Sequence, residues 1–155
     1  MPDIFTNEWY QAMIDLCNSR DDLSAKVPKG EYKFAIELVG DGKSPYVPEG
    51  TTKHFFLIFK DGKVTQCEES PEKISGKGLN YRITGAAEDF ELIATGDKDP
   101  VDAGLSGQLN VRGDMRFLMQ NAEMATVIFE VYQQSKMTTW PMGKPPYDNI
   151  EKVAV

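Results

Sequence analysis

Alternating apolar and polar residues in the first part of the chain predict a run of β-strands. Residues 32–38 alternate large apolar side chains with small or polar ones, which is typical of a strand with one buried face. Residues 54–59 are apolar at even and odd positions, so we expect this strand to be covered on both faces and central in its sheet. The Asp-Gly pair at 61–62 is a strong hairpin signal and places a third strand at 64–68. Residues 79–84 alternate again and predict a fourth strand.

A period of three to four residues marks the helices. The first is predicted over residues 6–20, with Asp3 or Thr6 as its N-cap. Its apolar stripe consists of Trp9, Met13 and Leu16, with Ile14 and Cys17 at the edge.

Later elements follow the same logic. A short helix is expected over residues 86–95, and a further helical piece opens at Pro100. A short fifth strand is expected at 108–112, and one long helix over residues 114–134.

The order of helix, strand meander, helix, strand and helix predicts an α+β fold, with a mostly antiparallel five-stranded sheet covered by helices. We find no internal repeat or linker, so the chain is expected to form a single domain over residues 1–155. Its core is expected over about residues 7–134. The proline-rich residues 135–155 are expected to form a largely irregular C-terminal tail.

Composition narrows the class of partner. The 155 residues include 17 Lys and Arg against 24 Asp and Glu, a net charge of −7. This acidic balance argues against nucleic acid, because binding to a phosphate backbone needs concentrated basic side chains. No apolar stretch approaches the length that spans a bilayer, and the N-terminus lacks the features of a signal peptide. We therefore expect a cytoplasmic protein without an integral membrane segment.

Candidate catalytic and metal-binding groups are few. His54 is the sole histidine, and its place at the start of a strand favours a structural role over a catalytic one. Cys17 and Cys67 do not form a CxxC pair, so both are expected to pack as small apolar residues. The acidic run at 97–102 lacks the ligand spacing of a calcium loop, and no phosphate-binding glycine loop is present. We predict no catalytic residue, no metal and no cofactor.

Methionine is frequent toward the last helix, as Met115, Met119, Met124 and Met137. Methionine adapts to irregular shapes, so one interpretation is that this helix borders a pliable ligand cavity. In the other interpretation, the same methionines are ordinary residues of the packed core.

Three segments in the second half of the chain carry a family resemblance. Residues 89–96 form an Asp-Phe helix that ends in Thr-Gly, and residues 99–103 open a short helix after a proline. Residues 106–114 contain a Gly-x-Leu-x-Val-x-Gly-Asp strand. In this order and spacing these segments resemble the C-terminal half of sterol-carrier-protein-2-type (SCP2) domains. The predicted strands over residues 32–84 also fit the pattern of that family, so the resemblance covers about residues 7–134. The chain differs from that pattern in its tail and in a longer loop at 40–52.

The resemblance implies that the sheet and helices enclose an apolar tunnel for a lipid, fatty acid or fatty acyl-CoA. Burial of an acyl chain contributes about 0.8 kcal/mol per CH₂ group, so an apolar wall suffices for affinity and no catalyst is needed. The candidate wall residues are Phe34, Ile36, Leu57, Phe59, Phe90, Ile93, Phe117, Leu118, Met124 and Ile128.

Three functions are compatible with these features. The favoured one is non-catalytic binding, and transfer, of a hydrophobic ligand. The alternative is an accessory or oligomerisation module, in which Trp140 and Tyr147 of the proline-rich tail dock on a partner such as a second copy in a homodimer. The least favoured is an enzyme on a hydrophobic substrate that uses His54 with a nearby carboxylate.

Overall fold

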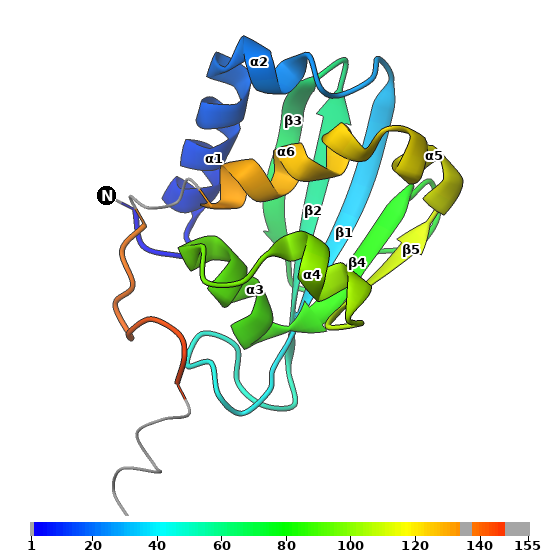
Figure 1. Ribbon diagram of the computed structural model, residues 1–155. Coiled ribbons are helices and arrows are strands. Elements are labelled where there is room, and N and C mark those ends of the chain that lie inside the picture. Colours follow the sequence, from blue (N-terminus) through cyan, green and yellow to red (C-terminus); the bar gives the residue numbers. More distant parts are fainter. Residues whose placement is uncertain (1, 134–137, 148–155) are drawn as a thin grey trace, which may run out of the picture.

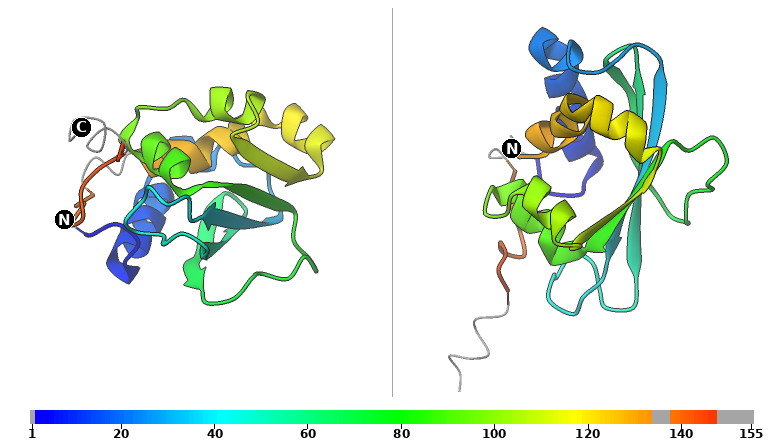
Figure 2. Two further views of the ribbon diagram at one scale, coloured as in Figure 1. Left: turned by 90° about the horizontal axis from the view of Figure 1, so that it is seen from below. Right: turned by 45° about the vertical axis from the view of Figure 1, so that its right-hand side comes forward.

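The helices of the chain lie on one face of a five-stranded sheet (Figure 1 and Figure 2). The computed structural model describes residues 2–133 and 138–147. The elements in chain order are α1 (Asn7–Ser19), α2 (Asp21–Ser24), β1 (Glu31–Val39), β2 (Thr52–Lys60), β3 (Lys63–Ser70), β4 (Tyr81–Ala86), α3 (Ala87–Thr95), α4 (Pro100–Leu105), β5 (Leu109–Gly113), α5 (Met115–Gln120) and α6 (Ala122–Gln133). The α+β fold with a mostly antiparallel sheet, predicted from the sequence, is confirmed.

The sheet has the strand order β3-β2-β1-β4-β5, so β1 is its middle strand. β1 pairs antiparallel with β2 and parallel with β4, while β3 and β5 are antiparallel edges. The apolar strand β2, expected to be central, is interior but second from one edge. Its outward side chains Phe56 and Ile58 are only half-buried, because the helices cover the other face and the outer face carries the segment 71–80 (Figure 2).

The predicted hairpin joins β2 and β3. Asp61 and Gly62 both have positive φ, 50° and 85°, as a type I′ turn requires. A Cβ at Gly62 would lie 2.6 Å from the carbonyl oxygen of Ser24. Glycine therefore provides the turn conformation and the space for the C-terminal end of α2 to pack against the hairpin.

The prediction of one long helix over residues 114–134 is wrong in one respect, because the structure has two helices there, α5 and α6. Asp114 caps α5 by accepting a hydrogen bond from the Phe117 backbone N–H at 3.1 Å. Asn121 ends α5, since its backbone N–H and its side-chain Nδ2 both donate to the carbonyl of Phe117. An asparagine side chain competes in this way with the regular helix ladder. α6 then starts at the next residue, with Met124 N–H donating to the Asn121 carbonyl.

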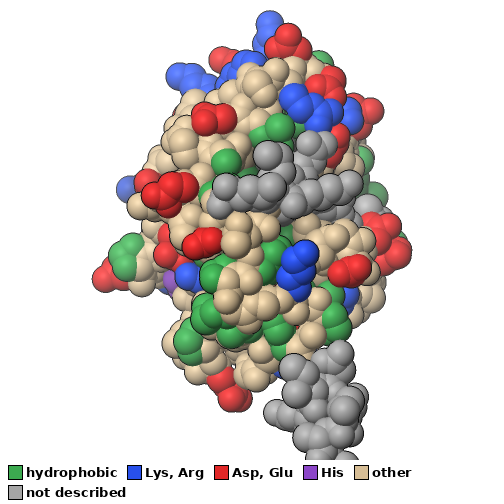
Figure 3. All heavy atoms as spheres, turned by 90° about the vertical axis from the view of Figure 1, so that its left-hand side faces the viewer, with side chains coloured by type: hydrophobic (Ala, Val, Ile, Leu, Met, Phe, Trp, Pro, Cys, Tyr) green, Lys and Arg blue, Asp and Glu red, His purple; other side chains and the backbone are tan. Residues whose placement is uncertain are grey.

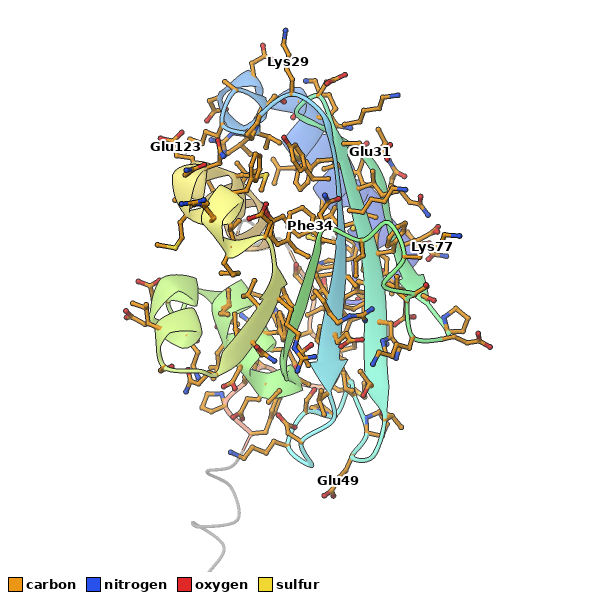
Figure 4. The ribbon with its side chains drawn as sticks, turned by 90° about the vertical axis from the view of Figure 1, so that its right-hand side faces the viewer. Lys29, Glu31, Phe34, Glu49, Lys77 and Glu123 are labelled. Carbon is orange, nitrogen blue, oxygen red and sulfur yellow. The ribbon has the colours of Figure 1, made fainter. Side chains whose placement is uncertain are left out.

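The core fills the space between the sheet and the helices. Phe34 of β1 lies on the helix side of the sheet in Figure 4, whereas Lys77 lies on the opposite side. Phe34 stacks on Tyr81 and meets Phe59 edge to face, with ring centroids 5.2 and 6.0 Å apart. The alternation predicted for residues 32–38 thus places the even-numbered residues of this strand in one packed interior.

Replacement of Gly62 tests the hairpin. We expect Gly62→Ala to lower the free energy of unfolding by about 2 kcal/mol, because alanine adds left-handed strain and a clash with Ser24. Gly76→Ala is the matched control, since a Cβ there meets nothing within 4 Å. Urea denaturation followed by circular dichroism measures both variants, and equal midpoints for the two would contradict this account of the turn.

Candidate functional site

An apolar cavity of about 80 Å³ lies between α1 and the inner face of the sheet. α1 supplies five of its thirteen lining residues, the strands β1, β2 and β3 supply seven, and α3 supplies one. The lining residues are Trp9, Tyr10, Met13, Ile14, Cys17, Ile36, Leu38, Phe55, Leu57, Phe59, Val64, Cys67 and Phe90.

The helical half of the cavity follows from the spacing along α1. Thr6 caps the helix, and its Oγ1 accepts a hydrogen bond from the Trp9 backbone N–H at 3.3 Å. From that start, residues four apart fall on one face, so Trp9, Met13 and Cys17 all point at the sheet. The sequence prediction of Thr6 as a possible N-cap is confirmed.

The strand half follows from register. Ile36 of β1 lies opposite Phe55 of β2, and Leu57 of β2 lies opposite Cys67 of β3. Because side chains alternate across a strand, this pairing gathers residues of three strands on the same face. This half of the cavity wall is therefore determined by the pairing of β1, β2 and β3.

Hydrogen bonds hold both ends of α1 against the rest of the molecule. Near its C-terminal end, Asn18 donates from Nδ2 to the Val64 carbonyl at 3.0 Å and accepts at Oδ1 from the Val64 N–H at 2.8 Å. Near its N-terminal end, Trp9 Nε1 donates to Thr138 Oγ1 at 2.8 Å. Met13 and Ile14, between these points, are half-buried and face the cavity.

The cavity offers a medium without charge. None of its thirteen lining residues carries a carboxyl, an ammonium or a guanidinium group. Burial raises the pKa of Cys17, and it raises the pKa of Cys67 to about 12, with Glu68 adding to the effect. Both thiols are therefore neutral near pH 7, and the site accommodates hydrocarbon rather than an ion.

The ten candidate wall residues separate into three groups. Four of them line the cavity: Ile36, Leu57, Phe59 and Phe90. Five others belong to the packed interior without lining it: Phe34, Ile93, Phe117, Leu118 and Met124. The side chain of Ile128 lies outside the described residues. Ligand contact by any of them remains a prediction.

Sequence reasoning missed the contribution of α1. Its stripe of Trp9 and Met13, with Ile14 and Cys17 at the edge, was visible in the helical period, but a stripe does not show whether a helix packs tightly or leaves space. The sequence instead suggested the last helix as a border of the cavity, because of its methionines. Of these, Met124 is fully buried while Met119 is 77% exposed, and neither lines the cavity.

His54 belongs to a polar cluster on the outer face of the sheet, opposite the cavity. Its Nδ1 lies 3.4 Å from Glu37 Oε2, and Arg82 lies 2.6 Å from the same oxygen. Burial acts to raise the pKa of Glu37, but the Thr84 hydroxyl, Arg82 and His54 outweigh it and lower the pKa below its usual value. Arg82 also donates to the Ile74 carbonyl, so the cluster fastens the segment 71–80 to the sheet.

The tail residues proposed as anchors for a partner pack on their own chain. Trp140 meets Tyr46 edge to face with centroids 6.0 Å apart, and the Tyr147 hydroxyl donates to Glu91 at 2.6 Å. Both side chains are half-buried there.

Two further properties bound the chemistry. Within residues 2–133 and 138–147, no group of three or more His, Cys, Asp or Glu side chains is arranged to hold a metal ion. No helix in that part of the chain is long and apolar enough to cross a bilayer.

Comparison with known proteins gives the family. The model of the SCP-2 sterol transfer family matches residues 14–126, and the chain therefore belongs to that family. A crystal structure of sterol carrier protein 2 superposes with a TM-score of 0.72 at 17% identity, over 85% of this chain and 98% of that one. A conserved hypothetical protein of Thermus thermophilus is described as possibly a sterol carrier protein. It superposes with a TM-score of 0.66 at 17% identity, over 91% of this chain and 94% of that one. Both likenesses show the fold. No curated protein sequence matches the chain.

The thiols of the cavity provide a test of its burial. At pH 8 we expect Cys67 in the folded protein to react with a thiol reagent at least about 100-fold more slowly than in urea, because a pKa of about 12 leaves very little thiolate. Thr65, an exposed residue of the same strand at the β-bulge opposite Ile58 and Phe59, supplies the control, as Thr65→Cys. Labelling followed by mass spectrometry measures both sites; equally fast reaction at residues 65 and 67 would show that the cavity wall is open.

Proposed function

We propose that this protein binds a lipid or fatty-acyl ligand without catalysis, and transfers it, with the hydrocarbon part held between α1 and the sheet. The observation that supports the proposal is a cavity lined by thirteen residues of which none is charged, in a chain of the SCP-2 sterol transfer family. Each CH₂ group that leaves water for such a site contributes about 0.8 kcal/mol.

The size of the cavity adds a condition. Its 80 Å³ compares with roughly 300–1,000 Å³ for pockets that bury a drug-sized ligand. An acyl chain therefore enters only when the wall moves outward. The middle of α1 is the part best suited to move, because hydrogen bonds at Asn18 and Trp9 hold its ends while Met13 and Ile14 make apolar contacts between them.

The lining also limits how the ligand is oriented. A carboxylate or phosphate inside the cavity would lose its hydration and meet no cation there. A charged headgroup therefore stays at the surface, and only hydrocarbon enters. Binding is expected to depend on chain length, with a change in heat capacity that follows the apolar area buried.

Catalysis has no support from the same geometry. The sole histidine and its carboxylate neighbour Glu37 lie on the face of the sheet opposite the cavity, in a cluster that also includes Arg82 and Thr84. A substrate in the cavity is separated from His54 by the sheet itself. We therefore assign the cluster a structural role, which agrees with the function proposed.

Filling the cavity tests the proposed function. We expect Cys67→Phe to weaken the binding of a fluorescent fatty acid at least tenfold, because the larger side chain takes up the space between β3 and α1. Thr65→Phe is the matched control, with the same added ring at an exposed position of the same strand. Fluorescence titration measures both, and a thermal melt verifies that each variant is folded.

Equal affinity of the two variants would contradict the assignment of the cavity, and absence of binding by the unaltered protein would contradict the proposed function. As an independent arm, native mass spectrometry of freshly purified protein followed by organic extraction identifies any co-purified lipid.

A further inference from the structure

The segment Thr138–Tyr147, here called the strap, begins beside the N-terminal end of α1, where Trp9 lines the cavity. It forms a bridge with the N-terminus, where the Ile4 N–H donates to the Thr139 carbonyl at 3.0 Å and the Thr139 N–H donates to the Pro2 carbonyl at 2.9 Å. The strap runs along the left-hand side of Figure 1, the side that faces the viewer in Figure 3, and its Met142 is 56% exposed. The N-terminus and the start of the strap are thus held together beside α1.

Contacts connect the strap to the cavity wall in two ways. The direct one is the buried hydrogen bond from Trp9 Nε1 to Thr138 Oγ1, since Trp9 lines the cavity. The other is a series of aromatic rings from Trp140 through Tyr46 to Phe5, with centroids 6.0 and 5.9 Å apart. Phe5 in turn packs on Trp9 and on Phe55, which also lines the cavity.

The far end of the strap is fastened to α3. The Tyr147 hydroxyl donates to Glu91 Oε1 at 2.6 Å, and the Tyr147 N–H donates to Glu88 Oε2 at 3.1 Å. Glu91 is fully buried, and its Oε1 accepts a second hydrogen bond from Ser44 Oγ at 3.0 Å. Its Oε2 is buried and accepts no hydrogen bond from residues 2–133 or 138–147. A carboxyl in this position favours the protonated form.

We propose that the strap is a lid on the apolar cavity, closed by Tyr147 on Glu91 and opened when the Glu91 carboxyl loses its proton. This proposal rests on the proposed function in one respect, namely that a ligand enters the cavity past the strap. Release of Tyr147 frees Trp140 and Thr138, and with them the aromatic wall formed by Trp9 and Phe5.

The sign of the pH dependence follows from linkage. Burial raises the pKa of Glu91 to about 7, and nearby Asp41 and Glu88 add to the rise, while the Tyr147 and Ser44 hydrogen bonds oppose it. In the open state water solvates the carboxyl, and its pKa falls toward the ordinary value near 4.5. The closed state therefore holds the proton more tightly, so closure is strongest at low pH and weakens as pH rises through about 7.

Other charged groups around Glu91 do not reverse this sign. Asp41 accepts from the Glu88 N–H at 3.0 Å, and Lys43 lies 3.7 Å from Glu88. On α6, β4, β1 and the strap, the remaining charged groups are turned to solvent or paired with one another: Glu123 and Lys144 are exposed, Glu130 pairs with Arg20 and Lys26, Glu37 with Arg82, and Lys33 with Glu31.

Entry of a thiol reagent into the ligand-free protein tests the lid. The two cysteines of the chain both line the cavity, so their labelling rate reports how often it opens. We expect Tyr147→Phe to raise the rate at Cys17 about tenfold near pH 6, because it removes one hydrogen bond to a carboxyl and keeps the ring. Tyr32→Phe is the matched control, since its hydroxyl donates to Lys29 on the far side of the molecule.

Glu91→Gln separates the pH response from a merely structural role. Glutamine retains the acceptor for Tyr147 and Ser44 but does not titrate, so the ratio of the wild-type labelling rate to the Gln rate is expected to rise about tenfold between pH 6 and pH 9. The ratio cancels the titration of the thiol itself. Glu31→Gln, at an exposed site, should give a ratio that is flat over the same range.

The outcomes distinguish the lid from the proposed function. Labelling that is unchanged in Tyr147→Phe, or a ratio independent of pH, overturns the lid even if fatty acid binds normally. Binding that is absent while the labelling rates follow the expectation overturns the proposed function and leaves the lid. When both hold, stopped-flow measurements on Tyr147→Phe should show faster association and faster dissociation of the fluorescent fatty acid.

Discussion

The indole of Trp9 is the contact on which the arrangement of this protein depends. Its ring is 2% exposed, packs edge to face on Phe5 and Tyr10, and forms part of the cavity wall. Its Nε1 donates to Thr138, which is 129 residues away in sequence. An indole fits this position because it combines a large apolar surface with one directional donor. Helix, cavity and strap therefore meet at a single side chain.

The fold was predictable from the sequence where local rules determine it. The alternation in β1, the Asp61-Gly62 turn and the N-cap at Thr6 each depend on a few neighbouring residues, and the structure has all three. The interruption at Asn121 was not predicted, because the apolar stripe continues through it and the hydrogen bonds that end α5 there come from the Asn121 backbone and side chain. The strand order β3-β2-β1-β4-β5 was not predicted either, because local patterns do not show which distant strands pair.

The site was predictable only in part, for a different reason. Helical and strand periods indicate which side chains face inward, and Ile36, Leu57, Phe59 and Phe90 do so beside the cavity. They do not indicate where the inward side chains fail to meet. A cavity is a property of packing between elements that are distant in the chain, here α1 and the three strands beneath it. For that reason the search along the methionine-rich last helix missed the wall formed by α1.

The hydrogen bond between Trp9 and Thr138 also has a consequence for the order in which the protein folds and opens. Bringing two groups together costs chain entropy that increases with the length of the segment between them, and this contact spans 129 residues. The meander of β1, β2 and β3 closes much shorter loops and provides the framework on which α1 docks. Attachment of the strap is therefore expected to be a late event in folding. Once the sheet and helices are packed, detachment of the strap leaves their contacts in place, so the native protein can open there locally without global unfolding.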